Sequence, residues 1–170
     1  IVAYGADPSG GVEVTAGFAG PAAGRTWLSP SEVTGAAIRV EELVEQVSDG
    51  IGGLLKIARK RPVLFDLAPA SPASPAPAFA RVAETLIQWA EAHPGVRARP
   101  VVVHCTRGEF EPDAVRQSIA QLREAERATE PVALYHAILT ESAHRTVAYP
   151  AAPDAIERDA LRALWEATSP

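Results

Sequence analysis

The chain has 170 residues, 47% of them hydrophobic, and a formal net charge of -5 at pH 7. That length suits a single domain with a sizeable core, and so mild a charge argues against a nucleic-acid surface, which needs clustered Lys and Arg. The single cysteine, Cys105, excludes an intramolecular disulfide. No apolar run reaches membrane-spanning length and no signal peptide is visible. We therefore expect a cytoplasmic protein with one domain over residues 1–170 and no membrane contact.

The first part of the chain predicts two hairpins and a short helix. An apolar run at 1–4, a Gly- and Pro-rich turn, and alternation from Val12 onward predict an antiparallel hairpin. Ser29 followed by Pro30 and Glu32 predicts a helix start. Residues 37–55 are ambiguous, because their valines and leucines also fit helical spacing. The turn at Ser48-Asp49-Gly50 and the β-branched residues before it favour an extended hairpin, which we prefer.

The second part of the chain alternates apolar runs with helical stripes. The basic run 59–61 indicates a solvated entry to an apolar strand. Prolines in 68–77 forbid a helix or a central strand there. Buried strands are expected at 62–67, 100–105 and 131–139, and helices at 78–92, 112–126 and 154–166. This order predicts a parallel sheet covered by helices on both faces, with the first hairpin as an antiparallel edge. Function in such sheets usually sits in the loops after the strands.

An ordered series of short motifs resembles the bacterial von Willebrand factor A (vWA) family. The series comprises Ala23-Gly24-Arg25, Ser31-Glu32, Arg39-Val40-Glu41, Asp49-Gly50-Ile51-Gly52-Gly53-Leu54, Pro62-Val63-Leu64-Phe65 and the run from Pro100 to Glu109. The resemblance spans nearly the whole chain, although no single motif is specific. It implies a three-layer, Rossmann-like α/β fold and a role in binding other proteins.

The chain departs from this family where the family binds a metal ion. The strand with the Asp-x-Ser-x-Ser motif is absent, because Ile1 aligns with the strand that follows it. In the second metal-site loop, 70–75, only Ser74 is a plausible ligand. The third element, Thr-Asp-Gly-Glu, is Thr106-Arg107-Gly108-Glu109 here. A divalent cation prefers anionic oxygen ligands, and Arg107 brings a permanent positive charge instead.

We therefore expect no metal ion or other cofactor, and a rim of degenerate metal-site loops that contacts a protein. The candidate rim residues are Asp66, Ser71, Ser74, Thr106, Arg107 and Glu109. The absent strand would lie mid-sheet, between the first hairpin and the strand at 62–67. Because open inner edges aggregate, we expect an upstream segment of the same polypeptide or a strand from a partner to fill that place.

Two patterns in the sequence bear on catalytic and metal-binding alternatives. His104-Cys105-x-x-Gly108 resembles the opening of a tyrosine-phosphatase signature, but the position of its phosphate-clamping arginine is Glu111, which would repel phosphate. The simpler interpretation is that Cys105 is a small buried residue at a strand end. The histidines show no close zinc-ligand spacing, so core or surface positions are expected for them.

The sequence thus predicts a non-catalytic vWA-type module that binds proteins within a bacterial regulatory or conflict-system assembly. Its expected partner is another protein or another segment of the same polypeptide. The alternatives are a phosphatase-like hydrolase that uses Cys105 and a structural segment of a larger enzyme.

Overall fold

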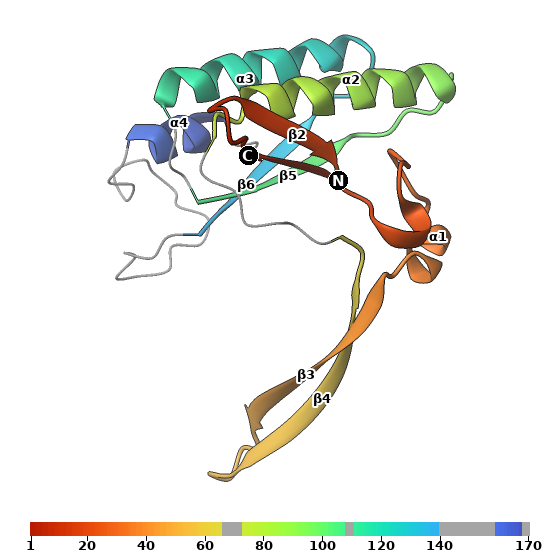
Figure 1. Ribbon diagram of the computed structural model, residues 1–170, viewed down its shortest axis with the longest axis vertical. Helices are drawn as coiled ribbons and strands as arrows, with labels where there is room; N and C mark the ends of the chain where they lie inside the picture. Colours follow the sequence, from red (N-terminus) through yellow and green to blue (C-terminus); the bar gives the residue numbers. More distant parts are fainter. Residues whose placement is uncertain (66–72, 108–110, 140–158, 168–170) are drawn as a thin grey trace. The chain divides into compact units, whose positions relative to one another are not determined.

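A computed structural model describes residues 1–65, 73–107, 111–139 and 159–167 (Figure 1). This part of the chain is mixed α/β and contains three two-stranded sheets, β1–β2, β3–β4 and β5–β6. It divides into two compact units, one formed by Ile1 and Ala16–Pro69, the other by Val2–Thr15 and Ala70–Pro170. The elements are β1 Val2–Ala6, β2 Val12–Ala16, α1 Pro30–Gly35, β3 Arg39–Ser48, β4 Leu54–Val63, α2 Ala76–Ala92, β5 Val101–Thr106, α3 Pro112–Glu124, β6 Ala133–Ile138 and α4 Asp159–Ala167, with 3-10 turns at Gly20–Ala22 and Ala125–Arg127.

The first hairpin and the first helix agree with their sequence signals. Backbone hydrogen bonds flank the β1–β2 pair, from Asp7 N–H to Gly11 O at 3.0 Å and from Gly17 N–H to Ile1 O at 2.9 Å. The prediction of a hairpin at the start of the chain is therefore confirmed. Helix α1 begins with a capping box: the Ser29 side chain accepts from the Glu32 N–H, and the Glu32 carboxylate accepts from the Ser29 N–H.

The second hairpin is an arm of two ten-residue strands. Strands β3 and β4 pair antiparallel in one continuous register, from Arg39 opposite Val63 to Ser48 opposite Leu54. The Asp49 carboxylate closes the turn, because its Oδ1 accepts from the N–H of Ile51 at 2.9 Å and of Gly53 at 2.8 Å. Turn chemistry thus decides the ambiguous stretch, and the preference for a hairpin over a helix is confirmed.

The arm also corrects one predicted strand. The run 62–67 was expected to be a buried parallel strand, but Pro62 and Val63 end β4, Leu64 and Phe65 belong to no strand, and 66–67 lie outside the described residues. The basic run 59–61 lies within β4, not at the entry to a buried strand. The reason is that the antiparallel ladder starting at the turn continues without a break through all ten positions of β4. Pro62 and Val63 therefore belong to this ladder and not to a separate strand.

The second unit contains one parallel strand pair. Strands β5 and β6 pair in parallel, with Val101 opposite Ala133 and Thr106 opposite Ile138. The predictions of parallel neighbours at 100–105 and 131–139 are confirmed. Helices α2 and α3 occupy the expected places, and α4 is described from Asp159, with 154–158 outside the described residues. A larger parallel sheet is not seen within the described ranges.

The core of this unit lies between the β5–β6 pair and the helices. Its buried residues fall into two clusters, Phe79, Leu122, Val132 and Leu134 in one and Val115, Ala163 and Leu164 in the other. Val102 packs against the first cluster and Ile138 against the second. Val102, Leu134 and Ile138 share one face of the strand pair, because side chains alternate along a strand and register partners point the same way. Helices α2, α3 and α4 therefore all cover this face (Figure 1).

The opposite face of the β5–β6 pair is exposed in the part of the chain that the structure describes. It carries Val103, which is 63% exposed, its register partner Tyr135, which is 39% exposed, and Cys105. Leu139, directly after β6, is 69% exposed. Parallel strands are normally covered on both faces, so an exposed apolar face on such a pair is unusual.

Candidate functional site

Three of the predicted rim residues are described: Ser74 lies just before α2, and Thr106 and Arg107 lie at the end of β5. Ser74 is partly buried, and its Oγ accepts from the Ala76 N–H at 3.3 Å at the start of α2. Thr106 is the last residue of β5, and Arg107 follows it with its side chain exposed. The other predicted rim residues, Asp66, Ser71 and Glu109, lie outside the described residues.

A buried polar network that the sequence did not reveal joins Thr106 to three other side chains. The Tyr4 hydroxyl lies 2.8 Å from His104 Nε2 and donates to Thr106 Oγ1 at 3.4 Å. His104 Nδ1 lies 3.0 Å from His136 Nδ1. His104 and His136 are register partners in the parallel pair, so the fold itself brings the two rings together. The ring of Phe79 from α2 packs against His104 in a T-shaped arrangement, with ring centroids 5.0 Å apart.

The proton positions in this network depend on the tautomer of His104. A hydrogen bond between two Nδ1 atoms requires a proton on one of them only. The tautomer of His104 decides whether the Tyr4 hydroxyl accepts from His104 Nε2–H or donates to Nε2, and it sets the direction of the bond to His136 accordingly. The buried Nε2 of His136 has no hydrogen-bond partner among the described residues.

Both histidines are held neutral near pH 7. Burial lowers the pKa of His104 to about 4, and burial together with the adjacent His104 lowers the pKa of His136 to about 3. A neutral, enclosed pair that uses its nitrogens on each other and on Tyr4 is suited to fixing the strand register. One sequence signal could have found it: a histidine stands at the fourth position of each parallel strand.

Cys105 does not have the setting of a phosphatase nucleophile. It lies inside β5, opposite Ala137 of β6, and it is exposed, so the expectation of a buried cysteine is wrong. The reason is strand alternation: His104 faces the helices, and the next side chain faces the uncovered side. His104 is held by Tyr4 and His136, and Glu111, the residue before α3, remains exposed where a phosphatase needs an arginine.

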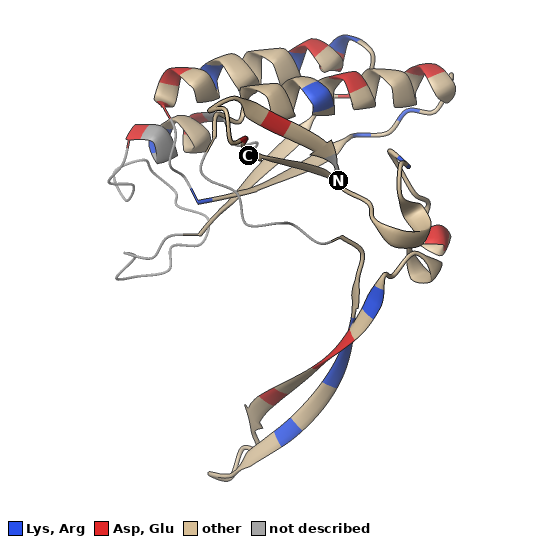
Figure 2. Cartoon of the chain, in the orientation of Figure 1, with Lys and Arg blue, Asp and Glu red and all other residues tan. Residues whose placement is uncertain are grey.

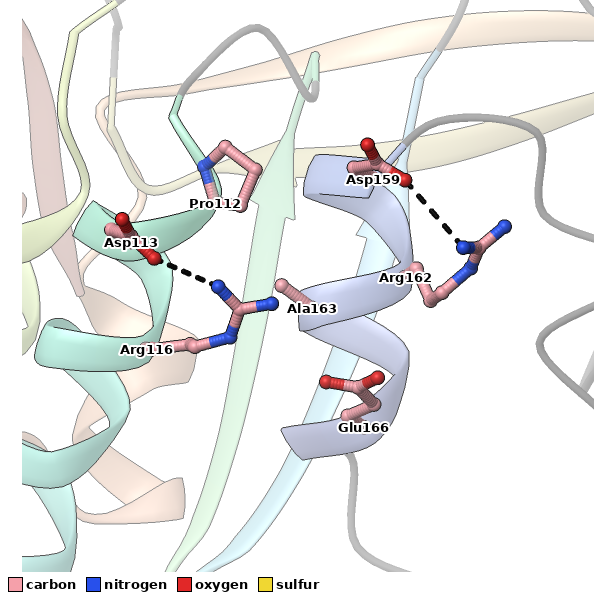
Figure 3. Close-up of a pocket in the computed structure, with 7 residues that line it drawn as sticks. All are labelled: Pro112, Asp113, Arg116, Asp159, Arg162, Ala163 and Glu166. Carbon is pink, nitrogen blue, oxygen red and sulfur yellow. Dashed lines mark hydrogen bonds and ion pairs between the residues drawn. The ribbon is translucent and has the colours of Figure 1, made fainter.

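A polar groove of about 400 Å³ lies between the start of α3 and one side of α4 (Figure 3). Its two arginines are each paired with the acid three residues earlier on the same helix. Arg116 lies 2.8 Å from Asp113, and Arg162 lies 3.5 Å from Asp159. Pairs so exposed contribute little to stability, and with Glu166 the groove lining has one more acid than arginine.

The described residues contain no group of three His, Cys, Asp or Glu side chains that could hold a metal ion. No helix among them has both the length and the apolar character needed to cross a bilayer. In comparisons with known proteins, no family model matches the chain, and neither a curated protein nor a solved structure shows significant similarity to it.

Proposed function

We propose that the chain is a vWA-type module that binds another protein and has no catalytic role of its own. The motif series from Ala23 to Glu109 supports the family assignment, and the parallel β5–β6 pair with its connecting α3 is consistent with it. In this proposal the described elements belong to a three-layer sheet whose remaining parts come from a partner or from another segment of the same polypeptide. A bacterial regulatory or conflict-system assembly is the proposed setting.

The observation that carries the proposal is the uncovered face of the β5–β6 pair. Val103 and Tyr135 stand opposite each other there, with Cys105 beside them, and together they make an apolar strip on strands of a kind that is usually buried on both sides. The β5 sequence, three valines followed by His-Cys-Thr, is apolar on both faces over its first half. Such a strand is typical of a sheet with two covered faces.

Two matched substitutions on exposed valines test the proposal. Val103→Glu alters the uncovered sheet face, and Val96→Glu makes the same change at a 55% exposed site outside the sheet. We expect both variants of the isolated chain to keep the wild-type melting temperature, because neither side chain is in the core. The proteins captured by the wild-type chain from its source cells are identified, purified and titrated against both variants. Val103→Glu should weaken binding at least about tenfold, while Val96→Glu should not.

Wild-type affinity in Val103→Glu would contradict the proposed sheet-face contact. The rim is tested with the same purified partner by Arg107→Glu, with Arg81→Glu on α2 as the control for the charge change.

The hydrolase alternative is tested by activity on phosphotyrosine peptides. We expect no turnover above that of Cys105→Ser, because His104 is committed to the core and Glu111 stands at the position of the phosphate-clamping arginine. Turnover that Cys105→Ser abolishes would overturn the non-catalytic assignment.

A further inference from the structure

The β3–β4 arm is long, exposed and apolar on both sides. Every residue of 54–62 is exposed. Large apolar side chains are exposed on both faces of the arm, for example Val44 on one face and Leu55 on the other face. At its tip Ile51 is 92% exposed. An isolated two-stranded hairpin is marginally stable in water and becomes stable when further strands or a covering layer are added. The arm is therefore built to receive another segment.

Charge is divided between the two strands (Figure 2). Strand β3 carries Glu41, Glu42 and Glu45 with one arginine, whereas β4 carries four cationic side chains and no acid. On one face the charges are paired within the arm: Arg61 lies 2.8 Å from Glu41, and Arg59 lies 3.2 Å from Glu45.

The other face of the arm carries two lysines against one glutamate. The only two lysines of the chain, Lys56 and Lys60, lie four residues apart on it. Lys60 stands opposite Glu42, but Lys56 stands opposite the neutral Gln46. A net positive strand in a molecule of net charge -5 is a local exception that favours an acidic ligand.

The same charges disfavour a second copy of the chain as the occupant. A symmetric β4–β4 edge would bring two sets of four cations together, and a symmetric β3–β3 edge would bring two sets of three glutamates together. Only β3 against β4 of another copy is complementary, and that head-to-tail contact does not close and would propagate into filaments.

We propose that the outer edge of β4 binds an extended acidic segment of a partner protein, which adds as a third strand. Backbone hydrogen bonds along 54–61 would supply affinity, and carboxylates facing Lys56 and Lys60 would supply selectivity. Pro62 has no N–H and ends the ladder there. The assignment rests on the proposed protein-binding role and names the chemistry of one partner segment.

The test uses the full chain and a defined probe. The probe is an end-capped, dye-labelled ten-residue peptide with glutamate at alternate positions and valine or threonine between them. Fluorescence anisotropy should show saturable binding of this peptide and none of the same peptide with lysine in place of glutamate. Methylating alternate backbone nitrogens on one edge of the peptide should abolish binding, because that edge can then no longer form the ladder.

Lys56→Glu with Lys60→Glu should weaken binding at least about tenfold, whereas Arg81→Glu with Arg127→Glu, which changes net charge equally on helical and 3-10 segments, should not. Lys56→Gln with Lys60→Gln, which removes the charges without reversing them, should give an intermediate loss. Carbodiimide coupling should join the peptide to Lys56 or Lys60, the only ε-amines in the chain.

Absence of binding, binding indifferent to the lysines, or lysine-dependent self-association seen by sedimentation without peptide binding would each overturn the assignment. None of these results bears on the sheet-face contact, which the Val103 and Val96 pair tests separately.

Discussion

At the scale of single residues, the contact between His104 and His136 depends on how the two strands pair. Neither His104 nor His136 has the spacing of a metal site, and their matching positions, fourth in each strand, indicate a contact only once the strand pairing is known. They meet because the register that places Val101 opposite Ala133 also places His104 opposite His136, three residues further along each strand. Proximity of this kind depends on strand pairing, which is a tertiary property and cannot be read from either strand alone.

The histidines predict how stability depends on pH. Both pKa values are lowered in the folded protein, to about 4 and about 3, so between pH 6.5 and those values the unfolded chain binds more protons than the folded one. The free energy of unfolding should therefore be highest above about pH 6.5 and should fall as the pH is lowered. The expected loss is about 1–2 kcal/mol per histidine between pH 7 and pH 5. Urea unfolding measured at several pH values checks this.

A variant without the two histidines shows how much of the pH dependence they cause. His104→Gln with His136→Gln should flatten most of the pH dependence, whatever it does to stability at pH 7. The exposed His93 serves as the control, and His93→Gln should leave the dependence unchanged. A double variant that retains the full slope would show that other groups cause it.

Arg107 carries the prediction about metal ions. Calorimetric titration with Mg²⁺, Mn²⁺ or Ca²⁺ should show no saturable binding, because a fixed cation replaces the aspartate that the resemblance leads one to expect. Arg107→Asp alone should not create binding, since the given sequence contains no Asp-x-Ser-x-Ser motif to supply the other ligands. Saturable binding to the wild-type chain that disappears in Ser74→Ala would contradict this expectation.

At the scale of elements, local chemistry made most of the helices and hairpins predictable. The Ser29 capping box and the Asp49 turn are local, so their signals lie in a few adjacent residues. The run 62–67 was assigned wrongly because its apolar character equally suits a buried strand and the end of a long arm. The candidate site was predictable only at its loops; the burial of His104 and the exposure of Cys105 required the strand pairing.

Leu134 within β6 and Leu139 directly after it predict unequal effects of the same substitution. Leu134 is fully buried against α2 and α3, so Leu134→Ala should lower the free energy of unfolding by about 2–5 kcal/mol. Leu139 is exposed, so Leu139→Ala should cost less than about 1 kcal/mol in the isolated chain. Urea denaturation of both variants measures the difference, and equal losses would show that Leu139 is already covered.

At the scale of the whole molecule, the second unit has helices against one face of a parallel strand pair. Three helices cover one face of the parallel pair, and the apolar side chains of the other face remain exposed in the described residues. The proposed function assigns that face to another protein or to another segment of the same polypeptide. The account then predicts that the face is exposed in the isolated chain and covered in the native assembly.

Cys105 is a built-in reporter for this central claim, because it is the only cysteine of the chain and it lies on the exposed face. The measurement is the rate of maleimide labelling of Cys105 in the isolated chain and in the native assembly purified from its source cells. The account predicts rapid labelling of the isolated chain, labelling slowed at least about tenfold in the assembly, and recovery of the rapid rate after dissociation. Equal rates in the isolated chain and in the assembly would contradict it.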